Sequence, residues 1–181
     1  MSDARAAAFA QLGASTLGES GGQPMAARLK AAWPGARISA PAYPVTCAAG
    51  DNLAIHVAVA EAPSGSVIVA SVGAEPARGY WGEVLTTGAE GRGIVGLVID
   101  GGVRDATALE AHGFPVFSSM IALKGATKEL PGRVGGQALV GDVLAAGQAR
   151  EAKEAGFFDA LRKGTTTVEL LGLDTSPVTR D

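Results

Sequence analysis

The chain has 181 residues, enough for one domain with its own hydrophobic core. Hydrophobic residues make up 47% of the sequence and charged residues 18%, a composition typical of a globular protein and not of a disordered one. The net charge is −3, aromatic residues make up 5%, and no basic stripe is visible, so we expect no nucleic-acid partner.

The N-terminal segment, residues 1–35, is predicted to form short helices broken by glycine. Ser2 and Asp3 can cap a first helix that ends at Gly13. This segment lacks the basic start and the apolar run of a signal peptide, and nowhere does the sequence contain about 20 consecutive apolar residues. We therefore expect no membrane partner.

Two strand-like pieces, residues 36–40 and 43–47, follow a Pro-Gly turn signal. The second piece ends at Cys47, the single cysteine of the chain. One cysteine excludes an intramolecular disulfide and a cysteine-rich zinc site. We expect a reduced, cytoplasmic protein in which Cys47 is a small buried hydrophobe.

From residue 51 onward the pattern alternates between helices and short apolar strands. The predicted order is a helix over 52–60 capped by Asp51, a strand over 66–72, a loop over 73–79, a helix over 82–91, a strand over 94–99, a tight turn at Gly101 and Gly102, a helix over 105–112 and a strand over 115–117. This order is typical of parallel α/β architecture, in which functional loops gather at the carboxyl ends of the strands.

The last third is less regular. We predict a loop over 124–136, a strand over 138–140 and one long helix over 144–163, so that residues 144–171 form a C-terminal helix and tail. The sequence has no internal repeat, and residues 1–181 are predicted to be a single α/β domain.

Charged residues follow two successive predicted strands at the point where each helix begins. Glu83 lies in the first turn of one helix, and Arg104 and Asp105 lie in the first turn of the next. If the two strands are neighbours, both helix N-termini face one cleft, where free N–H groups and the helix dipoles favour an anion. The carboxylate of a small oxo acid is one such anion.

Each of these residue types suits that chemistry. Arg104 can bind a carboxylate through two parallel hydrogen bonds, and the main-chain N–H groups of Val84 and Leu85 can bind it as well. Asp105 and Glu83 are oxygen ligands suited to Mg²⁺ or Mn²⁺. A divalent ion beside a bound 2-oxo acid polarises its carbonyl group and stabilises an enolate.

Taken one at a time, the same residues have structural interpretations. Asp105 is an ordinary helix cap, Glu83 an ordinary partner of the helix dipole, and Arg104 an ordinary surface ion-pair residue. Only their joint placement in two successive strand–helix turns favours a functional site.

Five other polar residues are open to more than one interpretation. His56 is more readily a packed or interface residue than a base. His112, at a helix C-terminus, is interpreted as structural, because a cation there suits the dipole. Asp100 is expected to brace Arg104, while Lys124 and Lys128 either rim the pocket or are simply solvated.

The residues of this constellation resemble a known signature. Twenty residues separate Glu83 from Arg104 and Asp105, which is similar to the acidic-residue/twenty/Arg-Asp pattern of the family that includes class II 4-hydroxy-4-methyl-2-oxoglutarate aldolases and RraA, a regulator of ribonuclease activity. Other stretches look like the same family, namely residues 33–37, 50–56, 96–105, 113–117 and 149–154.

This resemblance implies an RraA-like swivelling β/β/α fold, trimers or hexamers with sites at subunit interfaces, and a metal-dependent lyase. The implied reactions are retro-aldol cleavage of 4-hydroxy-2-oxo acids to pyruvate and decarboxylation of oxaloacetate. Asp105 would bind the metal directly, Glu83 would hold metal-bound water, and Arg104 would bind substrate and polarise its keto oxygen. The substrate site would be completed by the backbone of Gly82, Val84 and Leu85.

One segment departs from the family pattern. Residues 141–143 run almost directly into the predicted C-terminal helix, so a strand hairpin present in relatives is expected to be missing. Some relatives take an acidic site residue from a neighbouring subunit, for which Glu151 and Glu154 are the candidates here. Two alternatives to the lyase therefore stay open: a non-catalytic RraA-like protein-binding regulator, and an enzyme repurposed for another small oxo acid.

Overall fold

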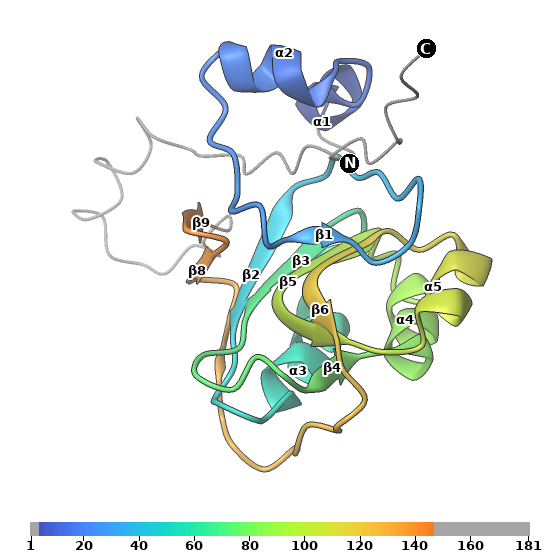
Figure 1. Cartoon of the computed structure of the whole chain (residues 1–181), viewed down its shortest axis with the longest axis vertical. Helices are drawn as coiled ribbons and strands as arrows, with labels where there is room; N and C mark the ends of the chain where they lie inside the picture. The colour runs from blue at the N-terminus through green and yellow to red at the C-terminus, as the bar shows by residue number, and fades with distance from the viewer. Residues whose placement is uncertain (1–3, 147–181) are drawn as a thin grey trace, which may run out of the picture.

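A seven-stranded, mainly parallel sheet forms the centre of the protein (Figure 1). The computed structural model describes residues 4–146. Strands pair in the order β1-β6-β5-β3-β2-β7, β4 pairs with β5, and only the outer strands β1 and β7 pair antiparallel. The bounds of these strands are β1 Lys30–Ala31, β2 Ala42–Thr46, β3 Val67–Ser71, β4 Gly79–Trp81, β5 Gly96–Val103, β6 Val116–Ile121 and β7 Arg133–Val134.

Helices and a separate hairpin surround this sheet. Two short N-terminal helices, α1 and α2, lie apart from the helices that follow strands (Figure 1). The helix bounds are α1 Ala4–Phe9, α2 Ala14–Glu19, α3 Leu53–Glu61, α4 Glu83–Glu90 and α5 Ala106–His112. The helices α3, α4 and α5 match those predicted over 52–60, 82–91 and 105–112, so the parallel α/β fold class is confirmed. Within the described residues, no helix is long and apolar enough to cross a membrane.

The central strand β3 is buried on both faces because layers cover both sides of the sheet. Ile68 and Ala70 belong to the core beneath α3 and α4, whereas Val67 and Val69 pack into a second core on the opposite face. This alternation follows from the two-residue period of a strand. It explains why the sequence of β3 is continuously apolar.

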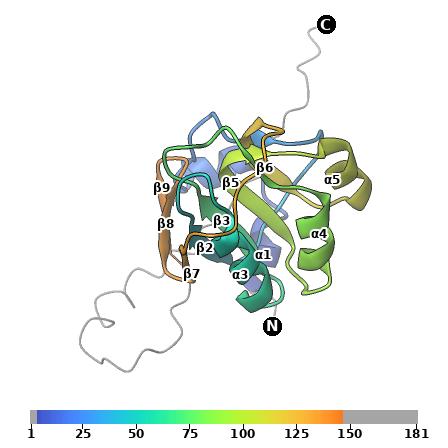
Figure 2. The ribbon, with the colours of Figure 1, turned by 90° about the horizontal axis from the view of Figure 1, so that it is seen from below.

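A hairpin covers the second face of the sheet, at its β2 side (Figure 2). Strands β8 Gln137–Val140 and β9 Val143–Ala146 pair antiparallel around a two-residue turn. Gly141 and Asp142 both have positive φ angles, 55° and 65°, as the common two-residue hairpin turn requires. The expectation that this part of the chain lacks a hairpin is therefore wrong.

The predicted helix from residue 144 is wrong at its start for the same reason. Val143 and Ala145 are buried while Leu144 is exposed, which is the period of a strand. Because Leu and Ala favour helices, the composition of this segment predicted a helix instead of a strand. The remainder of the predicted helix and tail, residues 147–171, lies outside the described residues, as do Glu151, Glu154 and the cap at Ser2 and Asp3.

Gly101 and Gly102 do not form the predicted tight turn but continue β5. Gly102 pairs with Gly79 on one side and with Met120 on the other. A Cβ atom at Gly102 would lie 2.5 Å from the carbonyl oxygen of Arg78, so only glycine allows this close approach of main chains. The neighbouring strand β4 was not predicted either: Gly79 was assigned to the loop, and Tyr80 and Trp81 lay between that loop and the next predicted helix.

Asp100 does not brace Arg104. Its carboxylate accepts hydrogen bonds from Nε and Nη2 of Arg28, at 3.0 and 2.7 Å, and from the main-chain N–H of Gly141 at 3.1 Å. Alternation along β5 places Asp100 on the same face as Val98, toward the hairpin and away from α4 and α5. The Arg28 guanidinium is the main cause that holds the pKa of Asp100 below its usual value.

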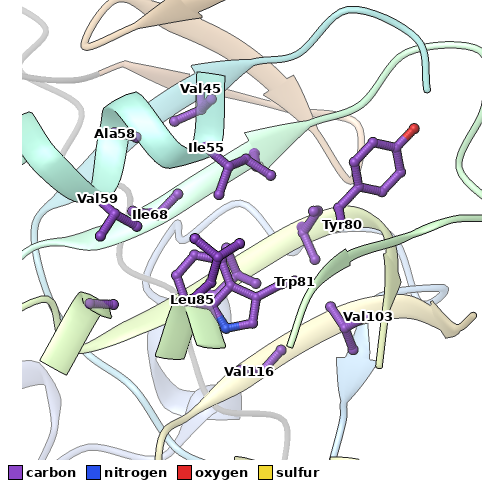
Figure 3. Close-up of a cluster of buried hydrophobic side chains, with 14 of the residues drawn as sticks. Val45, Ile55, Ala58, Val59, Ile68, Tyr80, Trp81, Leu85, Val103 and Val116 are labelled. Carbon is purple, nitrogen blue, oxygen red and sulfur yellow. The ribbon is translucent and has the colours of Figure 1, made fainter. Parts of the chain in front are cut away.

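The core beneath α4 and α5 fixes the end of β4. Trp81, labelled in Figure 3, is 1% exposed. It stacks on Phe114, with ring centroids 5.8 Å apart. Its indole N–H donates to Oγ1 of Thr86 at 2.7 Å, so the polar atom of the ring is satisfied within the core. Because Trp81 is anchored in this way, the next residues, Gly82 and Glu83, leave the strand at a defined position.

The two strand-like pieces predicted before residue 51 have different outcomes. Residues 43–47 overlap β2, but residues 36–40 form no strand.

Candidate functional site

The two predicted turns lie side by side because β4 and β5 are paired. Trp81 at the end of β4 is opposite Val103 at the end of β5. The main-chain N–H of Arg104 donates to the carbonyl oxygen of Trp81 at 2.9 Å. The main-chain N–H of Glu83 donates to Oδ2 of Asp105 at 3.2 Å. The structure thus brings the start of α4 directly against Arg104 and Asp105, which together we call the Arg104–Asp105 corner.

Asp105 does not act as an ordinary helix cap. It occupies the residue before α5 with φ 59° and ψ 36°, and its side chain makes no capping hydrogen bond to that helix. A left-handed conformation is uncommon for a residue with a side chain, and here it turns the carboxylate toward α4 instead. The side chain is 40% exposed. It therefore presents an accessible carboxylate that its own helix does not use.

Two glycines make room for Arg104. A Cβ atom at Gly79 would lie 3.2 Å from Cδ of Arg104, and a Cβ atom at Gly82 would lie 3.0 Å from its Cγ. The arginine side chain therefore lies across the main chain of β4. Its Nε is 3.6 Å from Oδ2 of Asp105, and 43% of the side chain is exposed. Guanidinium and carboxylate thus share one accessible corner of the protein.

The first turn of α4 supplies the remaining predicted residues. The N–H groups of a helix's first turn have no carbonyl partner within the helix, so those of Val84 and Leu85 are available where α4 begins. The Val84 side chain is 80% exposed, whereas Leu85 is buried in the core. The Glu83 side chain is 58% exposed, and its Oε1 lies 4.0 Å from Nε2 of His112. Glu83 therefore joins the corner through its main chain, while its carboxylate contacts the C-terminal end of α5.

Asn52 is a polar residue beside the site that sequence reasoning did not single out. Its Nδ2 donates to the carbonyl oxygen of Tyr80 at 2.8 Å, on the strand that leads to Gly82. Its Oδ1 is buried without a hydrogen-bond partner, and one helical turn later Nε2 of His56 is buried in the same condition. Such atoms in native proteins commonly bind water or a ligand. The sequence signals at this position were a helix start and the family-like stretch 50–56, and neither assigned a role to Asn52.

The pKa values of His56 and Cys47 are consistent with the structural interpretation of both residues from the sequence. Burial, with a contribution from Lys128, lowers the pKa of His56 against the opposing effect of Asp51. Burial and the nearby Asp51 raise the pKa of the Cys47 thiol to about 12. Cys47 is buried, as predicted, and this raised pKa keeps its thiol protonated.

A segment that follows β6 is tied down over the same edge of the sheet. The main-chain N–H of Gly79 donates to the carbonyl oxygen of Lys124 at 2.7 Å. Further along, Oδ2 of the buried Asp51 accepts hydrogen bonds from Oγ1 of Thr127 at 2.7 Å and from the N–H groups of Glu129 and Leu130 at 2.6 and 3.1 Å. We call residues 124–130 the strap. It carries Lys124 and Lys128, both exposed.

Substitution of Gly82 by alanine tests this packing. A Cβ atom there would lie 2.4 Å from Oδ2 of Asp105, so we expect the carboxylate and Arg104 to be displaced. Gly88→Ala is the matched control, because its Cβ would have only Val59 near it, at 3.9 Å, and alanine in a helix gains about 0.5–1 kcal/mol. Crystal structures of both variants should show the corner altered in Gly82→Ala alone. An unmoved Asp105 in that variant would contradict the prediction.

Known proteins share the sequence pattern and the fold of this chain. A family model described as "RraA-like: Aldolase/RraA" matches residues 2–149. The chain belongs to the RraA-like family. Solved structures agree at the level of the fold: the RNA-processing inhibitor RraA from Thermus thermophilis has a TM-score of 0.67 at 21% identity, over 75% of this chain and 84% of that one. Streptomyces coelicolor RraAS2, an unusual member of the RNase ES inhibitor RraA protein family, also has a TM-score of 0.67, at 20% identity, over 80% of this chain and 77% of that one.

A curated relative adds a link at the level of sequence. A protein of Halalkalibacterium halodurans named "Putative 4-hydroxy-4-methyl-2-oxoglutarate aldolase" is 40% identical over 81 residues, which is 45% of this RraA-like chain. The match spans 39% of that relative's length. The family assignment from the acidic-residue/twenty/Arg-Asp pattern is therefore confirmed, and the family includes both aldolases and RraA proteins.

Proposed function

We propose that this RraA-like protein is a divalent-metal-dependent lyase that acts on small 2-oxo acids. The reactions are retro-aldol cleavage of 4-hydroxy-2-oxo acids to pyruvate, decarboxylation of oxaloacetate, or both. The observation that carries the proposal is the shared corner of Arg104 and Asp105 against the start of α4, closed by the 3.2 Å hydrogen bond from Glu83. The name of the Halalkalibacterium halodurans relative supports the same reaction class.

The side chains at this corner fit Mg²⁺ or Mn²⁺. Within residues 4–146, no group of three or more His, Cys, Asp and Glu side chains is arranged to hold a metal. Mg²⁺ needs no such group, because it keeps several waters and is commonly bound through one or two carboxylates together with substrate. Asp105, with its accessible carboxylate, would hold the ion directly, and Glu83 would hold it through water. A divalent ion bound there supplies a Lewis acid that stabilises negative charge on the keto oxygen.

The protein's own groups complete the reaction. Arg104 binds the carboxylate of the 2-oxo acid with its planar guanidinium and donates toward the keto oxygen, where charge develops as the bond between C3 and C4 breaks. The N–H groups of Val84 and Leu85 bind the pyruvate half of the substrate, beside the backbone of Gly82. The 4-hydroxyl group loses its proton during cleavage, and the Glu83 carboxylate, once turned from His112 toward Asp105, would accept this proton through water.

An assay of pyruvate release tests the proposal. We expect the purified full chain to release pyruvate from oxaloacetate and from 4-hydroxy-4-methyl-2-oxoglutarate when Mg²⁺ or Mn²⁺ is present, and to lose this activity when the ion is chelated. Turnover that ignores chelation would contradict the metal dependence. No turnover of either acid would favour the two alternatives, a protein-binding regulator of the RraA type or an enzyme for another small oxo acid.

A further inference from the structure

Two side chains near the start of α3 each present a buried polar atom that has no hydrogen-bond partner among the described residues. These atoms are Oδ1 of Asn52 and Nε2 of His56. Asn52 is 5% exposed, so its amide lies inside the protein. Buried polar atoms in native proteins nearly always have a partner, either a protein group or an ordered water molecule. We therefore expect a further group beside this pair.

The orientation of the Asn52 amide follows from the carbonyl oxygen that it contacts. Nδ2 of Asn52 donates to the carbonyl oxygen of Tyr80 at 2.8 Å. A carbonyl oxygen only accepts hydrogen bonds, so the amide nitrogen must face it and Oδ1 must face away. The main-chain N–H of Asn52 already donates to the carbonyl oxygen of Thr127 at 2.9 Å. The free end of this side chain is thus an acceptor that needs an O–H or N–H donor.

The His56 ring lies one helical turn from Asn52. The main-chain N–H of His56 donates to the carbonyl oxygen of Asn52 at 3.2 Å, and helical side chains lean toward the N-terminus of their helix, so the ring leans toward Asn52. Burial, with a contribution from Lys128, lowers the pKa of His56, so the ring is neutral at pH 7 and Nε2 can either donate or accept. A water molecule between Oδ1 and Nε2 satisfies both atoms, because it can donate twice and accept as well.

We infer that Asn52 and His56 bind one internal water molecule and that His56 is thereby a positioning residue for the candidate site. The water donates to Oδ1 of Asn52 and makes a second hydrogen bond with Nε2 of His56. Asn52 in turn holds the carbonyl oxygen of Tyr80, two residues before Gly82. Fixing this carbonyl group fixes the point at which β4 ends and α4 begins. The role in catalysis rests on the proposed function, whereas the water site does not.

Crystal structures of the full chain, at a resolution that shows ordered water, test the water site. We expect one water within hydrogen-bond distance of both atoms in the parent protein. His56→Phe keeps a ring but has no ring nitrogen, so this water should be lost. His56→Gln keeps a polar side chain that can bind water, so the water should return. A parent structure with no water between the two atoms, or with a direct hydrogen bond between them, would overturn the inference.

Steady-state kinetics of pyruvate release test the positioning role. We expect His56→Phe to lower kcat/KM about two- to tenfold, the effect of one lost hydrogen bond, and His56→Gln to recover most of this loss. A merely structural role would lower the unfolding temperature of His56→Phe but leave kcat/KM of the folded protein unchanged. Val57→Ala is the matched control, because it changes an exposed neighbour on the same helix and should keep the parent kcat/KM.

The outcomes separate this inference from the proposed function. If the parent protein releases pyruvate, and His56→Phe loses the water but keeps the parent kcat/KM, the positioning role is overturned and the lyase stands. If the parent protein releases no pyruvate from either acid, the proposed function falls and the crystal structures decide the positioning role. The main chain at Gly82 should then shift in His56→Phe but not in Val57→Ala, and an unmoved Gly82 in both variants would overturn that role.

Discussion

Arg104→Ala is expected to lower kcat/KM for pyruvate release by about 10²- to 10³-fold, the usual loss when one preorganised donor to a developing oxyanion is removed. The side chain is 43% exposed and lies across Gly79 and Gly82, so its loss should leave the core intact. Steady-state kinetics with oxaloacetate and with 4-hydroxy-4-methyl-2-oxoglutarate, at saturating Mg²⁺, measure the effect. Circular dichroism should show an unchanged fold.

Arg104→Lys is the matched control for charge. Lysine keeps the positive charge but lacks the planar fork that pairs with a carboxylate, so we expect it to recover only part of the lost activity. Full activity in Arg104→Ala would show that Arg104 takes no part in the reaction. Full activity in Arg104→Lys alone would show that charge, and not bidentate geometry, is what the substrate needs.

Much of the fold was predictable because its signals are local. β3 and the first part of β5 are short apolar runs, and α3, α4 and α5 start and stop at residues that favour helix ends. The failures arise where tertiary contacts decide. Gly101 and Gly102 read as a turn, yet they continue β5 because neighbouring main chains approach too closely for a side chain. The strand β9 reads as helix because its packing on the sheet, and not its composition, sets its conformation.

The candidate site was predictable in its membership but not in its details. The order of strands and helices placed Glu83 near Arg104 and Asp105, since carboxyl ends of paired parallel strands meet at one edge of the sheet. No spacing rule could show that the Asp105 side chain leaves its own helix uncapped. None could show that the Glu83 carboxylate contacts His112, because this depends on the rotamers of two surface side chains.

Asp51→Asn is expected to lower the free energy of unfolding by about 3 kcal/mol at pH 7, because a buried acceptor shared by several donors is lost. Asp51 is 1% exposed, and its Oδ2 accepts from Thr127, Glu129 and Leu130. The amide oxygen of asparagine can replace Oδ2, but its amide nitrogen then faces the main-chain N–H of Leu53, which donates to Oδ1 of Asp51 at 2.8 Å. Urea denaturation measures the change, and Thr127→Val, which removes one of the donors, should cost only about 1 kcal/mol.

The pH dependence of the stability lost in Asp51→Asn identifies the cause of that loss. Burial alone would raise the pKa of Asp51, but the hydrogen bonds from Glu129, Leu53, Thr127 and Leu130 outweigh it and hold the pKa well below its usual value. Stabilisation by such a carboxylate is complete above the pKa of the unfolded chain, about 3.9, and is lost as the pH falls toward the folded-state pKa. The difference in the free energy of unfolding between the parent protein and Asp51→Asn should therefore narrow below about pH 5. A difference that stays constant down to pH 3 would show that the ionised carboxylate of Asp51 is not what holds the strap.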